Sequence, residues 1–228
     1  NQVYGGGGKG DTPVSHSFIE LYNSTDRDIN LENYRIAYLS KGTVESLDLT
    51  GTVPPHTSYL VQCAKEETDK AVCTLSNADI IWDMVISNKS YSVVLFDRET
   101  QVDGVSVNEE TVEGIPLEDP SGDTIISKNK SIRRIGFIDT DQNTDDFEVL
   151  NYSKLTPPLL ERVMPRSMQD GSWGIKDVVV KKEYTVTFSV DGVLTKVTVE
   201  EGSLVTPIAD PVKEGYQFDG WYSNGRKY

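Results

Sequence analysis

The sequence predicts a mainly β protein, folded as a sandwich or barrel and followed by a smaller β-rich module. Two observations carry this prediction. Short runs of β-branched and aromatic residues alternate with polar ones, and Asn, Asp, Gly, Pro and Ser fill the gaps between the runs. No segment keeps a 3.6-residue apolar period long enough to predict a helix, and only residues 65–84 suggest a single helical turn.

The alternating runs define the strands that we expect in the larger part of the chain. In the first run, Ile19 and Leu21 alternate with Phe18, Glu20 and Tyr22, so that successive side chains lie on opposite faces. The expected strands are 17–22, 34–39, 58–63, 92–97, 101–107, 131–137 and 147–152.

The pattern changes near Thr156. Residues 156–177 contain three prolines and two glycines and have few β-branched residues, which indicates a linker or an extended strap across a domain surface. The segment is too apolar for a free linker, so we expect its large side chains to pack on one or both neighbouring domains; they are Leu159, Leu160, Val163, Met164, Met168 and Trp173. A second β pattern begins at Val178, and Asp191-Gly192 between two alternating runs predicts a hairpin.

The charge of the chain limits its partners. Its 228 residues include 22 Lys and Arg against 36 Asp and Glu, a net charge of −14. Such a surface repels nucleic-acid phosphates, so we expect no nucleic-acid partner. No apolar run approaches the length that crosses a membrane, so we expect no transmembrane segment.

Cys63 and Cys73 are the two cysteines of the chain. Their spacing is not that of a CxxC metal site, and a disulfide closing a loop or hairpin is the favoured interpretation for an extracellular protein. The alternative is two unrelated buried thiols.

One acidic segment, residues 138–147, has the pattern of a cation site. Asp139, Asp141, Asn143 and Asp145 alternate as the oxygen ligands of calcium loops do. A helical calcium loop also requires Gly at its sixth and Glu at its twelfth position, where this chain has Thr144 and Leu150. The alternative is structural, because short Asp and Asn side chains also cap turns. Calcium is therefore the one possible cofactor, and we expect no other.

The sequence contains no recognisable catalytic motif. It has only two histidines and lacks HExxH, GxSxG and a Cys–His pair at a familiar spacing. We therefore predict no enzymatic activity in this fragment. Arg133 and Arg134 stand out in an acidic chain, and they indicate either an anion or partner contact or pairing with nearby aspartates.

Four blocks of sequence resemble the lamin-tail domain of the bacterial type, over residues 3–158. They are VYGGGGKG at 3–10, FIELYNSTDRDINLENYRIAY at 18–38, VVLFDRETQVDGV at 93–105 and SIRRIGFIDTDQNTDDFEVLNYSKLTPP at 131–158. The resemblance implies an immunoglobulin-like β-sandwich, a module of secreted or surface proteins that is often attached to hydrolase or nuclease domains. The family has no shared catalytic residues to transfer to this chain.

Residues 184–228 resemble the Listeria–Bacteroides repeat, also called the internalin B-repeat. The EGYQFDGWY segment carries the resemblance, which implies a small β-grasp-like module found repeated in bacterial surface proteins. The family pattern continues with another strand beyond Tyr228, so we expect the natural protein to continue. The expected domains are a lamin-tail-like sandwich at 1–158, a linker or strap at 159–182 and the repeat at 183–228.

These patterns predict a non-catalytic bacterial module, secreted or on the cell surface, used for attachment or protein interaction. The expected partner is a protein or cell-surface ligand, and the expected oligomeric state is a monomer. Two alternatives stay open: an accessory domain of a larger secreted hydrolase or nuclease, and a calcium-stabilised structural spacer.

Overall fold

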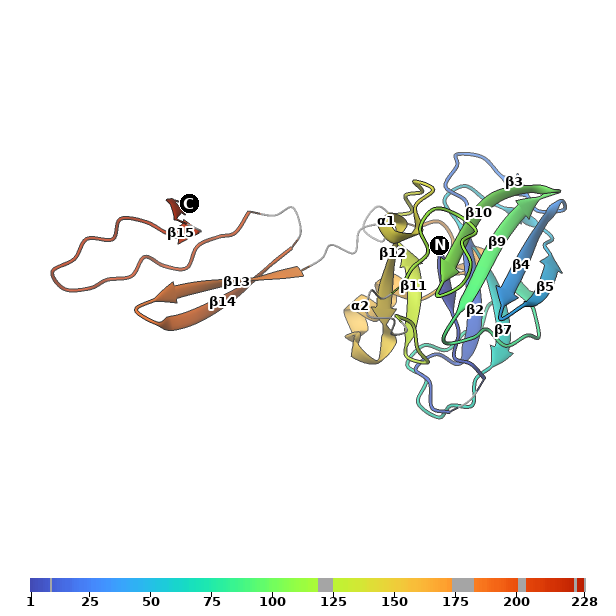
Figure 1. Cartoon of the computed structure of the whole chain (residues 1–228), viewed down its shortest axis with the longest axis horizontal. Helices are drawn as coiled ribbons and strands as arrows, with labels where there is room; N and C mark the ends of the chain where they lie inside the picture. Colours follow the sequence, from blue (N-terminus) through green and yellow to red (C-terminus); the bar gives the residue numbers. More distant parts are fainter. Residues whose placement is uncertain (9, 119–124, 174–182, 201–203, 224, 228) are drawn as a thin grey trace. The chain divides into compact units, whose positions relative to one another are not determined.

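The computed structural model describes the whole chain except residues 9, 119–124, 174–182, 201–203, 224 and 228. The chain forms two compact units, Asn1–Val179 and Val180–Tyr228 (Figure 1). Both are mainly β, which confirms the predicted fold class. No helix among the described residues has the length and apolar character needed to cross a membrane.

The first unit is a sandwich of two main sheets (Figure 1). The six-stranded sheet has the order β12 (Phe147–Asn151), β11 (Lys130–Arg134), β1 (Gln2–Tyr4), β2 (His16–Tyr22), β7 (Ser58–Lys65) and β8 (Ile80–Ile81). The four-stranded sheet has the order β10 (Thr100–Val107), β9 (Tyr91–Asp97), β4 (Tyr34–Ser40) and β5 (Thr43–Asp48). A further pair joins β3 (Ile29–Asn30) and β6 (Thr52–Val53).

The main core lies between the two sheets. Because side chains alternate along a strand, every second residue of each sheet points into this core. The six-stranded sheet contributes Ile19, Val61 and Ile132, and the four-stranded sheet contributes Ile36 and Tyr91; each of these is at most 1% exposed. The sandwich is therefore held together by apolar burial from both layers.

The outer face of the six-stranded sheet is buried as well. The alternate residues Tyr4, Phe18 and Leu60 form a second apolar cluster on that face, together with Tyr152 of the short 3-10 helix η1 (Tyr152–Lys154). Leu160 of helix α2 (Pro157–Val163) and Met164 pack against this cluster. The region after Thr156 thus covers an apolar surface that would otherwise face water.

Residues 164–173, here called the strap, continue across polar side chains of the same face and include the 3-10 helix η2 (Met168–Asp170). The backbone N–H of Arg166 donates to Oε1 of Glu20 at 3.1 Å, and that of Met168 donates to Oδ2 of Asp79 at 3.1 Å. The Trp173 indole N–H donates to Oγ of Ser58 at 2.8 Å. These bonds fasten the strap to the sheet at three separate places.

Trp173 is the last described residue of the strap and is 6% exposed. Its backbone N–H donates to the carbonyl of His56 at 2.9 Å, and the Arg166 guanidinium lies 3.8 Å from its ring centroid. The rest of the expected linker, residues 174–182, lies outside the described residues.

The predicted disulfide is wrong, because Cys63 and Cys73 are both free thiols. Cys63 belongs to the core between the sheets, whereas Cys73 belongs to the cluster on the outer face of the six-stranded sheet. A disulfide would have to pass through that sheet. Burial raises the pKa of both thiols to about 12, so both side chains stay protonated and apolar.

Residues 65–84 contain no helical turn, so that expectation is also wrong. The segment is tied to distant backbone instead: Oε2 of Glu66 accepts the N–H of Gly8 at 2.9 Å, and Oδ2 of Asp79 accepts the N–H of Leu60 at 2.7 Å. These long-range bonds hold the segment in an extended path and position β8 beside β7.

The second unit is built on the predicted hairpin, β13 (Glu183–Val190) and β14 (Val193–Glu200). Asp191 and Gly192 form its turn with φ of 48° and 86°, as a two-residue turn of this hand requires. A short pair, β15 (Tyr222–Ser223) and β16 (Arg226–Lys227), follows. The β-grasp arrangement remains a prediction.

Replacing Trp173 with alanine should show that the strap is part of the first unit. The change removes a buried aromatic side chain and its hydrogen bond to Ser58, so we expect a loss of about 3–5 kcal/mol in the free energy of unfolding, measured with urea. Leu159→Ala is the matched control, because Leu159 is 41% exposed and should cost less than about 1 kcal/mol. Equal, small effects of both changes would contradict the assignment.

Candidate functional site

The segment between β11 and β12 carries the predicted cation ligands, and the structure places them in different surroundings. Asp141 and Asp145 are exposed, and Asp141 has a left-handed φ of 57° at a bend of the chain. Asn143 is fully buried in the short helix α1 (Asn143–Asp146). Asp139 is half exposed and points toward β10. Calcium binding by these four residues stays a prediction.

Asn143 and Asp146 make structural hydrogen bonds, to distant β10 in the case of Asn143 and to nearby Thr140 in the case of Asp146. Oδ1 of Asn143 accepts the backbone N–H of Ser106 at 2.8 Å, and its Nδ2 donates to the carbonyl of Gly104 at 2.9 Å. Asp146 accepts both the N–H and the hydroxyl of Thr140. Since both side-chain ends of Asn143 are used by β10, this residue joins the segment to the four-stranded sheet.

Arg134 is the positive centre of this region and is 5% exposed. Its Nη2 donates to Asp103 of β10 at 2.6 Å, while Nη1 donates to Asp139 at 3.0 Å and to Asp146 at 3.1 Å. The guanidinium has enough N–H groups to serve several carboxylates in one plane. Of the two alternatives raised for this arginine, pairing with nearby aspartates is confirmed.

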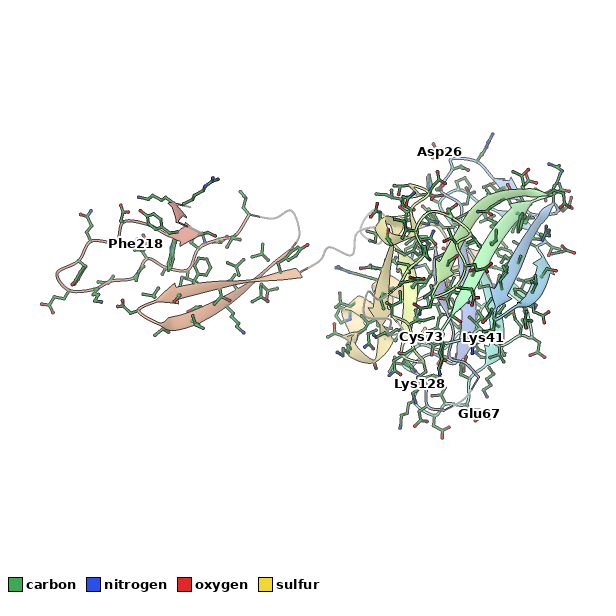
Figure 2. The ribbon with its side chains drawn as sticks, viewed as in Figure 1. Asp26, Lys41, Glu67, Cys73, Lys128 and Phe218 are labelled. Carbon is green, nitrogen blue, oxygen red and sulfur yellow. The ribbon has the colours of Figure 1, made fainter. Side chains whose placement is uncertain are left out.

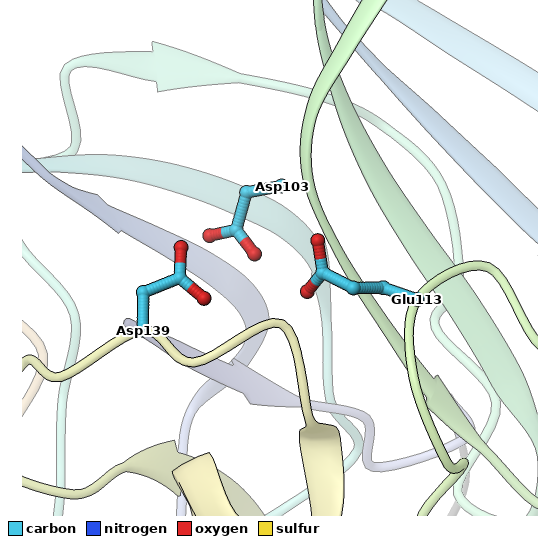
Figure 3. A group of neighbouring side chains, drawn as sticks. All are labelled: Asp103, Glu113 and Asp139. Atoms are coloured by element: carbon cyan, nitrogen blue, oxygen red, sulfur yellow. The ribbon is translucent and has the colours of Figure 1, made fainter.

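Glu113 adds a fourth carboxylate to the three that Arg134 contacts, and it completes the candidate site. Asp103, Glu113 and Asp139 each bring one carboxylate oxygen within 4.8 Å of the others (Figure 3). They come from β10, from the loop after β10 and from the segment after β11. Figure 3 shows the three side chains converging on one point from three separate stretches of backbone. Asp139 is the one predicted ligand that takes part.

The loop that carries Glu113 is held close to the segment that carries Asp139. Gly114 has a φ of +52°, and a Cβ added there would lie 2.3 Å from the carbonyl oxygen of Asp141. Only glycine permits this approach. The loop is also bonded to β10, because Nε2 of Gln101 donates to the carbonyl of Val112 at 2.8 Å. The three carboxylates are thus brought together by backbone packing.

The pKa of Glu113 reflects its partial burial and the repulsion among these carboxylates. Partial burial, followed by the neighbouring carboxylates of Asp103 and Asp139, raises the pKa of Glu113 to about 7. The single positive charge of Arg134 is shared among Asp103, Asp139 and Asp146. The site is therefore suited to hold a proton on Glu113 or to accept an external cation.

The second unit has a different candidate surface, an apolar groove of about 620 Å³. One face of the hairpin supplies Val186, Phe188 and Val190, and the following loop supplies Phe218 and Trp221; Phe218 is labelled in Figure 2. Among the described residues, no acceptor lies within hydrogen-bonding distance of the buried indole N–H of Trp221. The groove is therefore lined mainly by apolar and aromatic side chains.

Comparison with known proteins supports both resemblances in the predicted order. Residues 1–109 match the family model of the Lamin Tail Domain, and residues 184–228 match that of the Listeria–Bacteroides repeat domain. Internalin H of Listeria monocytogenes serovar 1/2a is 51% identical over 39 residues, which are 17% of this chain and 7% of internalin H. The chain thus spans a small fraction of that relative. Both family models describe non-catalytic domains.

Replacing Glu113 with glutamine should change how stability depends on pH. The carboxyl of Glu113 loses its proton near pH 4.5 in the unfolded chain but near pH 7 in the folded chain, so the folded state binds the extra proton between these values. Stability contributed by this group therefore falls as pH rises from about 4.5 to about 7 and stays low above that. We expect Glu113→Gln to raise the melting temperature at pH 8 and to leave it unchanged at pH 4.5.

The matched control is Glu110→Gln, an exposed side chain of the same loop. It should have the same small effect at both pH values. The interpretation of the site fails if Glu113→Gln and Glu110→Gln have the same pH profile.

Proposed function

We propose that this chain is a non-catalytic interaction module of a bacterial surface or secreted protein. The observation that carries the proposal is the match of residues 184–228 to the Listeria–Bacteroides repeat, beside the similarity of a 39-residue part of the chain to internalin H. Internalin-like repeats are typical of surface or secreted proteins. The partner is a protein or another ligand of a cell surface.

The exposed side chains of the second unit support a role in contact. Leu204, Val212, Tyr216 and Tyr222 are 91%, 99%, 76% and 56% exposed, and Tyr222 also lines the apolar groove. Large apolar side chains exposed to this extent offer contact area to a partner. The acidic chain repels copies of itself, which favours a monomer that binds other molecules.

Antibody labelling of intact cells tests the surface location. In the bacterium that encodes the chain, a specific antibody should label unbroken cells, or the protein should be recovered from the medium. A signal that needs cell lysis in both cases would contradict the proposal.

Binding of the purified chain to untreated and protease-treated cell surfaces tests the interaction. We expect the double variant Leu204→Ser and Tyr216→Ser to lose most of the binding, because it removes two exposed apolar contacts. Val72→Ser in the first unit is the matched control, since Val72 is also an exposed aliphatic residue at 53%. Equal binding of all three proteins would exclude the second unit as the contact surface.

A structural role for calcium is a second candidate, favoured by the convergence of Asp103, Glu113 and Asp139. Carboxylate oxygens from separate elements are the ligands that Ca²⁺ prefers, and a bound ion would relieve their mutual repulsion. Arg134 would remain as the partner of Asp146. The first unit would then be a cation-stabilised structural spacer.

Calcium titration followed by melting temperature separates the two possible ligand sets. If the three converging carboxylates bind the ion, millimolar Ca²⁺ should raise the melting temperature of the natural chain and of Asp145→Asn, but not of Asp103→Asn. Loss of the effect in Asp145→Asn alone would assign the ion to the sequence-predicted loop. No stabilisation of the natural chain at millimolar Ca²⁺ would remove the calcium role.

A further inference from the structure

Strand β5 is a six-residue edge of the four-stranded sheet, and within the described residues its outer side pairs with no other strand. Five of its six residues are exposed, including Val44 at 65%. The opposite edge of this sheet, β10, has a register irregularity at Gln101 and Asp103 and is bonded to the loop that follows it. Bulges and covering loops are two of the devices that protect sheet edges, and among the described residues β5 shows neither.

The register of the β4–β5 hairpin shows which backbone groups of β5 face outward. Ser40 pairs with Thr43 across the two-residue turn of Lys41 and Gly42, whose φ angles are 50° and 80°; Lys41 is labelled in Figure 2. The pair that closes such a turn is hydrogen-bonded, and the bonding alternates along the ladder. The N–H and C=O groups of Val44, Ser46 and Asp48 therefore point away from β4 and are open to another strand.

The two charged side chains of this edge, Glu45 and Asp48, are both acidic. Glu45 and Asp48 have no ion-pair partner among the described residues. Arg35 lies opposite Asp48 in the ladder, but its guanidinium stacks over Phe96 at 4.2 Å and lies 3.7 Å from Glu99. The nearest cation in the register is thus directed toward β9, and the edge keeps its negative charge.

We propose that β5 is the docking edge for an extended basic peptide segment of a partner protein, which adds to the sheet as a further strand. The proposal rests on the interaction function proposed above and names the partner's chemistry. Main-chain hydrogen bonds to Val44, Ser46 and Asp48 supply affinity, and Glu45 and Asp48 select positive charge. A second copy of this chain, with its net charge of −14, is repelled from the same edge.

The two acidic side chains also set the spacing of the basic ones. Glu45 and Asp48 are three residues apart, so they lie on opposite faces of the sheet. An added strand meets both when its lysines or arginines are three residues apart. An amphipathic basic strand with all its charge on one face meets only one of them.

A synthetic octapeptide with lysines at its second, fifth and eighth positions and Thr or Val elsewhere is the probe. Its binding to the full chain is measured by fluorescence anisotropy at physiological salt. The control peptide has the same sequence with every backbone amide nitrogen methylated, which keeps the charge and blocks strand pairing along both of its edges. We expect the unmodified peptide to bind about tenfold more tightly or better. Equal binding of the two peptides, or no binding by either, overturns the proposal.

Variants of β5 locate the binding on the chain. Ser46→Pro removes an outward N–H without removing a ladder bond to β4, and Ser46→Thr keeps that N–H. We expect Ser46→Pro to abolish binding of the unmodified peptide and Ser46→Thr to preserve it. If Ser46→Pro does not fold by circular dichroism, the pair Glu45→Gln and Asp48→Asn replaces it. Binding that survives in the folded variants overturns the assignment to β5.

The outcome is separable from that of the proposed function. If the octapeptide fails to bind while antibodies still label the cell surface, only the role of β5 is lost. If it binds β5 but the protein is found only inside cells, the surface function is lost and the peptide site remains.

Discussion

The six-stranded sheet is buried on both faces, and this constraint determines how the first unit is completed. Its inner face packs on the four-stranded sheet, but its outer face carries both large apolar residues and fully buried polar ones, among them Gln2, Glu20, Ser58 and Arg133. Neither kind can be left uncovered without cost, because the apolar groups need a dry partner and the polar groups need hydrogen bonds. Helix α2 covers apolar residues of this face, and the strap donates to two of the polar ones, from the N–H of Arg166 to Glu20 and from the indole N–H of Trp173 to Ser58.

The charged side chains of the first unit also need partners where they are buried. Burying a carboxylate is costly unless a cation or a donor meets it, and Arg134 pairs with the buried Asp146 and with the partly exposed Asp103 and Asp139. The close packing at Gly114 brings Glu113 beside Asp103 and Asp139, and partial burial together with these two carboxylates raises the pKa of Glu113. At β5 the carboxylates stay in solvent, where they discriminate among approaching molecules.

The elements that depend on patterns within a few residues could be predicted from the sequence. Alternation identified the long strands and the hairpin at Asp191 and Gly192, and the two family resemblances gave the order of the modules. What could not be predicted depends on contacts between distant residues. Asp103 lies close to Glu113 because β10 has a register irregularity and because the loop after β10 packs on the segment after β11. Cys63 and Cys73 lie on opposite faces of the six-stranded sheet, and the face that Cys63 takes is set by the register of β7. Strand β5 was not predicted because its apolar and polar residues alternate only weakly. The strand lies at a sheet edge and buries few of its side chains.

Native-state hydrogen exchange of the full chain tests most directly whether the strap completes the first unit. If it does, the amides of Arg166, Met168 and Trp173 are opened only when the sheet opens, and they should exchange with the same protection as the amides of β2 and β7. Exchange of these three amides at rates close to those of an unstructured chain, with β2 and β7 still protected, would show a detachable linker and contradict the account.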